Sequence, residues 1–204
     1  MDDKSIKQSN VIYFNEYLTK EKQETKRFHA SAVAGYTLMH ILLGGNKIKS
    51  ISTLDSDEEG ITFYEDTVIH FNRDRQPSKE SMSFLLNEAI IQAAGLISID
   101  LVENEAVNLE ENIDFLIRNM QSNIDNPRHP ILRICDYFCY DITETLLFIH
   151  FTMRRAVNII EHSDHFTDSL IELYNILLEG KRLDSDTIYA FTASRLGIHE
   201  SEPV

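Results

Sequence analysis

The stretch FLLNEAIIQAAGLISIDLV, residues 84–102, decides the fold class. Its apolar side chains recur at helical spacing and cover most of the helical circumference, which predicts a helix buried on nearly all sides. The stretch ASAVAGYTLMHILL, residues 30–43, has the same character. It is followed by Gly44 and Gly45, and glycine ends helices through the left-handed conformation that it tolerates. Both stretches are therefore expected at the centre of a helical domain.

Further helices are predicted along the C-terminal half of the chain, where apolar residues recur at the same period. They are expected at residues 108–120, at 167–179 and at 184–197. One long helix, straight or kinked, is expected at about 131–162 and carries Cys135 and Cys139 one turn apart. The proline-rich stretch 125–130 is expected to form a turn, since proline disfavours helix in the residue before it.

Residues 48–71 have a different pattern. Runs of β-branched and aromatic residues at 48–53, 61–64 and 67–71 are separated by Asp, Glu and Gly, which predicts a hairpin or a three-stranded meander. The expected fold is a mainly α, single-domain helical bundle of about six helices with this small β element. Residues 1–26 are expected to form an N-terminal docking helix and a charged linker, and residues 27–204 the helical domain with the β insertion at 48–71.

The composition limits the function classes. The chain has 204 residues, with 19 Lys and Arg against 33 Asp and Glu, for a formal net charge of -14. This charge argues against a general affinity for nucleic acid or for an anionic membrane. The start MDDKSIKQSN leads into no apolar export segment, and the chain has two cysteines, so the expected location is the cytoplasm. The uncharged stretch 29–46 contains His, Ser, Thr and Gly, which suits a core helix better than a membrane span.

The common cofactor and metal motifs are not found in the sequence. It contains no Gly-rich phosphate loop, no dinucleotide fingerprint and no Gly-x-Ser-x-Gly elbow, so no cofactor is expected. Two sets, His129 with Cys135 and Cys139, and His162 and His165 with Glu161 and Asp164, each supply only part of a transition-metal site. No metal site is therefore predicted.

The acidity favours an interaction or regulatory protein inside the cell, of the inhibitor, immunity or adaptor type, that binds a basic surface of another protein. Two groups of partner-binding residues are expected: the apolar side chains Ile12, Phe14 and Tyr17, and the carboxylates Asp55, Asp57, Glu58 and Glu59 of the predicted hairpin tip. A DNA-mimicking inhibitor is a second alternative, which requires carboxylates at phosphate-like spacing. The sequence leaves the choice between monomer and homodimer open.

One ionisable seam suggests an enzyme instead. A helical wheel aligns Asp141, Glu144, Thr152, Arg155, Asn158 and His162 in a polar stripe interrupted by Phe148. Within it, Arg155 and His162 have an Arg-x6-His spacing that resembles the motif of HEPN-type ribonucleases. The resemblance implies metal-independent RNA cleavage across a dimer, with His162 as acid or base at the ribose hydroxyl and Arg155 stabilising the phosphorane.

Overall fold

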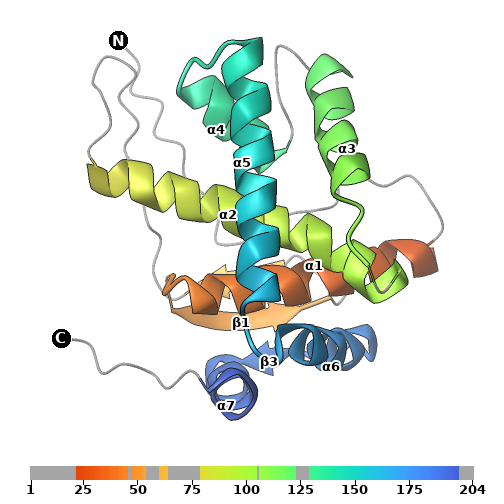
Figure 1. The fold of residues 1–204 in the computed structure, drawn as a ribbon. Coiled ribbons are helices and arrows are strands. Elements are labelled where there is room, and N and C mark those ends of the chain that lie inside the picture. The colour runs from red at the N-terminus through yellow and green to blue at the C-terminus, as the bar shows by residue number, and fades with distance from the viewer. Residues whose placement is uncertain are drawn as a thin grey trace, which may run out of the picture.

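A computed structural model describes residues 22–45, 47–53, 60–63, 79–104, 106–122 and 129–197, and in these ranges it contains seven helices and a three-stranded sheet (Figure 1). The helices are α1 (Lys22–Leu42), α2 (Lys79–Asn104), α3 (Leu109–Ser122), α4 (Pro130–Tyr137), α5 (Ile142–Glu161), α6 (Phe166–Leu178) and α7 (Ser185–Leu196). The strands are β1 (Ile48–Ser52), β2 (Gly60–Phe63) and β3 (Leu183–Asp184). The predicted fold class, mainly α with a small β element, is confirmed.

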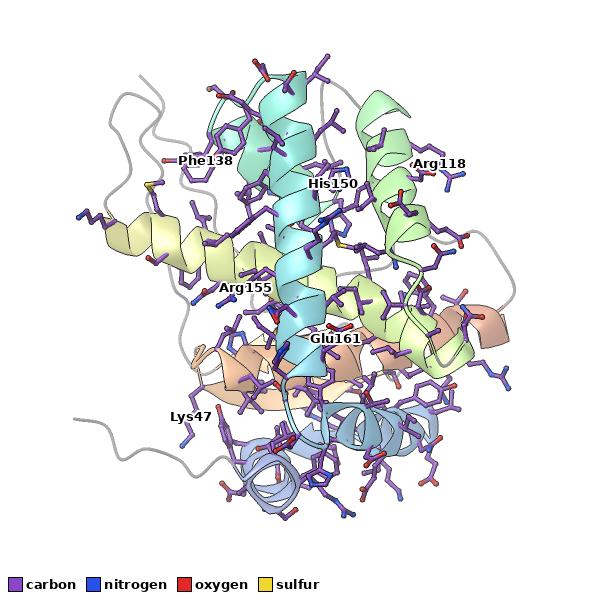
Figure 2. The ribbon with its side chains drawn as sticks, viewed as in Figure 1. Lys47, Arg118, Phe138, His150, Arg155 and Glu161 are labelled. Atoms are coloured by element: carbon purple, nitrogen blue, oxygen red, sulfur yellow. The ribbon has the colours of Figure 1, made fainter. Side chains whose placement is uncertain are left out.

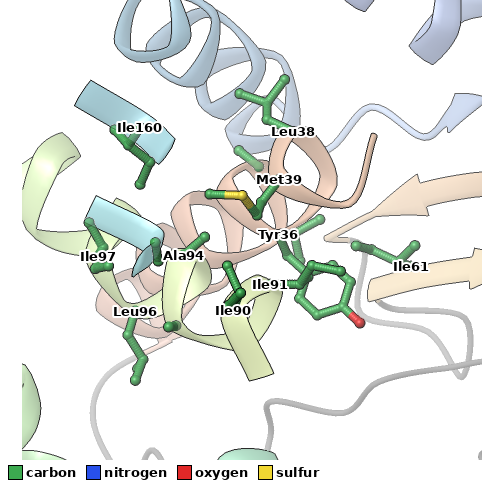
Figure 3. Close-up of a cluster of buried hydrophobic side chains, with 14 of the residues drawn as sticks. Tyr36, Leu38, Met39, Ile61, Ile90, Ile91, Ala94, Leu96, Ile97 and Ile160 are labelled. Atoms are coloured by element: carbon green, nitrogen blue, oxygen red, sulfur yellow. The ribbon is translucent and has the colours of Figure 1, made fainter. Parts of the chain in front are cut away.

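The helices α1 and α2 form the centre of the molecule, as the sequence predicts. Every residue at 29–41 and at 89–98 is buried. The helix α2 packs against α1 on one side and against α5 on another, and α6 packs against α1. Figure 3 shows the resulting cluster, in which Tyr36 and Met39 of α1 meet Ile90, Ala94 and Ile97 of α2. Because both helices are covered nearly all round, their apolar side chains stabilise the fold by removing apolar surface from water.

The end of α1 has the predicted geometry. Gly44 has a φ of 66°, the left-handed conformation, and its N–H donates to the Ile41 carbonyl at 3.1 Å. The Gly45 N–H donates to the His40 carbonyl at 2.9 Å, so carbonyls of the last turn are satisfied before the chain enters β1.

The sheet has the strand order β2-β1-β3, with both neighbours antiparallel to β1. Ile51 of β1 lies opposite Ile61 on one side and Leu183 on the other. The hairpin partners β1 and β2 come from the predicted region, whereas the third strand comes from Leu183 and Asp184. Of these two residues, the sequence predicts Asp184 at the start of the last helix. Asp184 belongs to β3 and also caps α7, because its side chain accepts from the Thr187 N–H at 3.0 Å. The run 67–71 lies outside the described residues.

The prediction of one long helix at 131–162 is wrong. The chain leaves the helical path after α4, where Cys139 has a φ of 55°. Asp141 then starts α5 with a capping box: its side chain accepts from the Glu144 N–H at 2.8 Å, and the Glu144 carboxylate accepts from the Asp141 N–H at 2.9 Å. Cys135 is consequently buried in α4 while Cys139 is exposed in the connection, so the two do not stack on one helix.

One polar contact bridges the two central helices. The Tyr36 hydroxyl of α1 donates to Glu88 Oε1 of α2 at 2.7 Å, and Gln92 Nε2 donates to the same oxygen at 2.9 Å. Burial, followed by the charge of Glu88, raises the pKa of Tyr36, so its hydroxyl keeps its proton and remains a donor. This contact satisfies polar groups at the helix interface and fixes the two helices relative to each other.

The segment Met82–Asn104 of α2 is long and apolar enough to cross a membrane by length and composition alone. Most of it is buried inside the protein, which is also the property of a core helix in a water-soluble domain. The sequence stretch that raised this question, 29–46, is instead largely the buried helix α1.

Candidate functional site

The residues predicted to bind a partner lie outside the described part of the chain. This applies to Ile12, Phe14 and Tyr17 and to Asp55, Asp57, Glu58 and Glu59. Their role stays a prediction.

The two residues of the ribonuclease alternative lie on α5. Arg155 is exposed on the outer side of the helix (Figure 2). His162 is the residue that caps the C-terminal end of α5, and its Nδ1 lies 2.8 Å from the carbonyl oxygen of Asn158. With Nδ1–H donating to that carbonyl, Nε2 is left to face solvent. The two residues are seven positions apart, or about 10 Å along the axis. Thr152, expected in the same polar stripe, is instead buried and donates to the Phe148 carbonyl.

The substitution His162→Ala tests the ribonuclease alternative. If the predicted pair cleaves RNA, His162→Ala will abolish metal-independent cleavage and leave the stability within about 0.5 kcal/mol, because the side chain is exposed. Cleavage of a single-stranded RNA in the presence of a chelator measures this. Wild-type cleavage no greater than that of a mock purification, or full activity in the variant, contradicts it.

A cavity of about 580 Å³ lies where the α2–α3 turn meets the α5–α6 turn. Its apolar lining is buried or half-buried, and it consists of Leu101, Val107, Leu109, Val157, Ile160 and Phe166. Its polar lining is exposed, apart from the half-buried Ser163, and consists of Glu161, Ser163, Asp164, His165, Thr167 and Asp168. The cavity thus combines an apolar interior with a polar rim, and its volume falls within the usual range of ligand pockets.

Asp100 fixes the α2–α3 wall of this cavity. Its Oδ2 accepts from the Asn108 N–H at 2.8 Å and from Asn112 Nδ2 at 2.7 Å. Asn108 in turn caps α3, because its side-chain oxygen accepts from the Glu111 N–H at 3.2 Å. These bonds place Val107 and Leu109, which flank Asn108, against the cavity.

The opposite wall is the short turn between α5 and α6. The Ser163 hydroxyl donates to the Ile159 carbonyl at 2.6 Å, and the Phe166 N–H donates to the Ser163 carbonyl at 3.1 Å. His165 has a φ of 61°, a conformation uncommon for a residue with a side chain. Its backbone turns the chain into α6 and lets Phe166 point inward, where it is 1% exposed.

The rim of the cavity is acidic. It contributes the carboxylates of Glu161, Asp164 and Asp168, and Figure 2 shows Glu161 at the end of α5 where the chain turns into α6. His165 Nδ1 lies 3.8 Å from Asp168 Oδ2, with both side chains well exposed. The N-terminus of α6 offsets only about half of one negative charge. The cavity therefore favours a ligand that is positively charged at the rim and apolar inside it.

Only one side of this cavity is visible in the sequence, and there it resembles part of a metal site rather than a binding pocket. The cluster at residues 161–165 stands out as a partial metal site, yet in the described ranges no three His, Cys, Asp or Glu side chains are grouped to hold a metal ion. The other side of the cavity comes from residues 101–109. These residues lie near residues 161–165 only because α2 and α3 pack against α5, and no local sequence signal indicates that packing.

No protein-family model matches the chain, and no curated protein matches it at a significant level.

Proposed function

We propose that this chain is an acidic interaction protein that binds a basic, amphipathic segment of another protein in the cavity between the α2–α3 and α5–α6 turns. The observation that carries the proposal is the combination of an apolar interior with a rim of three carboxylates. A Lys or Arg side chain fits such a site, because its methylene stem packs on apolar surface while its charged end meets a carboxylate.

The charge of the whole chain supports the same partner. A formal net charge of -14 raises the local concentration of positively charged segments and repels nucleic acid. Binding to an exposed carboxylate rim is also sensitive to screening. We therefore expect the association to slow as the salt concentration rises from about 50 to 500 mM, because the Debye length falls from roughly 14 to 4 Å.

The cytoplasm is the proposed location. Cys135 and Cys139 are both free thiols, which is the state that a reducing compartment maintains.

The test is a selection of random displayed peptides on the immobilised full chain, followed by affinity measurement on the enriched peptides. We expect enrichment of sequences that pair Lys or Arg with Leu, Ile or aromatic residues. The variant Asp164→Asn/Asp168→Asn should bind them about twofold to thirtyfold more weakly, since it removes two exposed ion pairs that contribute roughly 0.2–1 kcal/mol each.

A matched control separates the cavity from the overall charge. Asp114→Asn/Asp186→Asn also removes two exposed aspartates, one on α3 and one on α7. Asp186 matches Asp168 in position, because each lies in the first turn of its helix. The control should bind nearly as tightly as the wild type. Equal loss in both variants, or enrichment of acidic or uncharged peptides, contradicts the proposed site.

A further inference from the structure

The outer face of α5 has an exposed apolar patch. Leu147 is 66% exposed and Phe151 is 51% exposed, although both are large apolar side chains. They are four residues apart and therefore neighbours on one helix face, separated by about 40° around the axis. In Figure 1, α5 crosses in front of α2, and no described element covers this face in that view. Two adjoining exposed apolar side chains make this face a candidate contact surface.

The charges on either side of this patch have opposite signs. Glu144 lies one turn before Leu147, and Arg154 and Arg155 lie one turn after Phe151. All three side chains are exposed, and neither arginine forms an ion pair with a carboxylate of the described ranges. Figure 2 shows Arg155 on one flank of α5 and His150 on the other, so the patch lies between them.

The apolar pair is symmetric about one position of the helix, and the charges at equal distances on the two sides of that position are opposite. Its midpoint is Ile149, with Leu147 and Phe151 each two residues away, Glu144 five residues before and Arg154 five residues after. At 1.5 Å per residue along the helix axis, Glu144 lies about 7.5 Å before the midpoint and Arg155 about 9 Å after it. At 100° per residue, both side chains lie on the same side of the face.

We propose that this face binds a second copy of the chain, with the two α5 helices antiparallel about a two-fold axis that passes between Leu147 and Phe151, at the level of Ile149 along the helix. In that arrangement Leu147 of each copy packs near Phe151 of the other, and Glu144 of each copy pairs with Arg155 of the other. A two-fold contact must be self-complementary, and this face is complementary both in its apolar residues and in its charges. A single helix pair buries less surface than a standard interface, so we expect a weak dimer with a dissociation constant on the order of 10–100 μM.

The inference does not rest on the proposed function, since the cavity is lined by other residues. Sedimentation equilibrium of the full chain tests it, over concentrations that bracket the expected dissociation constant. The wild type should show a monomer–dimer equilibrium. Arg155→Glu places two like-charge pairs in the contact, as does Glu144→Arg, so each variant alone should dimerise at least about tenfold more weakly.

Mixing the two variants gives the decisive result. In a heterodimer, one original pair, Glu144 with Arg155, remains and the other pair is present with its charges exchanged, so the mixture should recover an affinity within about threefold of the wild type. Recovery supports the antiparallel contact. A wild type that stays monomeric, or two variants that do not recover on mixing, overturns it.

A third variant guards against a folding effect, because Glu144→Arg also removes the capping-box bond to the Asp141 N–H. Leu147→Ser/Phe151→Ser changes only exposed side chains and should abolish dimerisation with an unchanged circular dichroism spectrum. The matched control is Ile142→Ser, which removes a 71% exposed apolar side chain from α5 on the opposite side of the helix. Equal loss of dimer in the control overturns the assignment of this face.

Discussion

Lowering the pH from 6.5 towards 3 should destabilise the fold by about 1.4 kcal/mol per pH unit through His129 alone. His129 caps α4, is 3% exposed, and its Nδ1 accepts from the Ile131 N–H at 3.3 Å. Burial lowers the pKa of His129 from 6.5 to about 3. Between these values the unfolded chain binds a proton that the folded chain does not, so the contribution of His129 is complete above pH 6.5 and falls as the pH falls.

Urea unfolding at pH 7 and pH 5 measures this effect. The variant His129→Asn keeps a side-chain oxygen that can cap α4 but removes the titrating ring. Between the two pH values the wild type should lose about 2 kcal/mol more than the variant. Carboxylates titrate in both proteins and cancel in the comparison. Equal pH dependence in the two proteins contradicts a neutral, buried His129.

Gly35→Ala should destabilise the protein by about 2 kcal/mol, although alanine is the better helix former by about 1 kcal/mol. A Cβ at this position would lie 1.8 Å from Ser98 Oγ, 2.4 Å from Ser98 Cβ and 3.0 Å from the Ala94 carbonyl oxygen. Ser98 Oγ can move away by rotation about χ1, but Ser98 Cβ and the Ala94 carbonyl oxygen are fixed by the backbone of α2. The helices α1 and α2 must separate, and the core between them loses its packing.

A double-mutant cycle checks the cause. Ser98→Gly removes both side-chain atoms that the new Cβ meets, so Gly35→Ala should cost at least about 1 kcal/mol less in the Ser98→Gly background than in the wild type. Thermal unfolding should place the midpoint of Gly35→Ala about 4–8 °C below that of the wild type. A variant as stable as the wild type, or additive effects in the cycle, shows that the two helices are not in close contact at this point.

The sequence predicts those parts of the fold that are determined by the residues of a single segment. The helices α1 and α2 are predictable because apolar residues cover most of their circumference. The end of α1 is predictable because Gly44 readily adopts the left-handed conformation that ends helices. The break between α4 and α5 has a local signal too, the capping-box pair Asp141 and Glu144, which the continuous apolar pattern around it obscured. The strand β3 has only two residues, and its pairing with β1 is a tertiary contact that no run of residues indicates.

The candidate site also combines a part that is visible in the sequence with a part that depends on helix packing. The acidic cluster that includes Glu161 and Asp164 is visible in the sequence. The apolar interior is not, because Leu101 and Val107 are about 55 positions from Val157 and Ile160 and meet them only through helix packing. The exposure of Leu147 and Phe151 was also unpredictable, since apolar residues cover much of α5 outside its polar stripe. Which of these side chains face solvent depends on where α2 and α3 pack.

The most direct test of the central claim, that the cavity binds a basic and amphipathic segment, is a methyl NMR titration of the full chain with the tightest peptide from the selection. We expect the largest shifts at methyl groups that line the cavity, which are those of Leu101, Val107, Leu109, Val157 and Ile160. The Asp164→Asn/Asp168→Asn variant should need a higher peptide concentration for the same shifts. Shifts confined to methyl groups elsewhere, such as those of Ile171 on α6 or Ile188 on α7, would show that the peptide does not bind in the cavity.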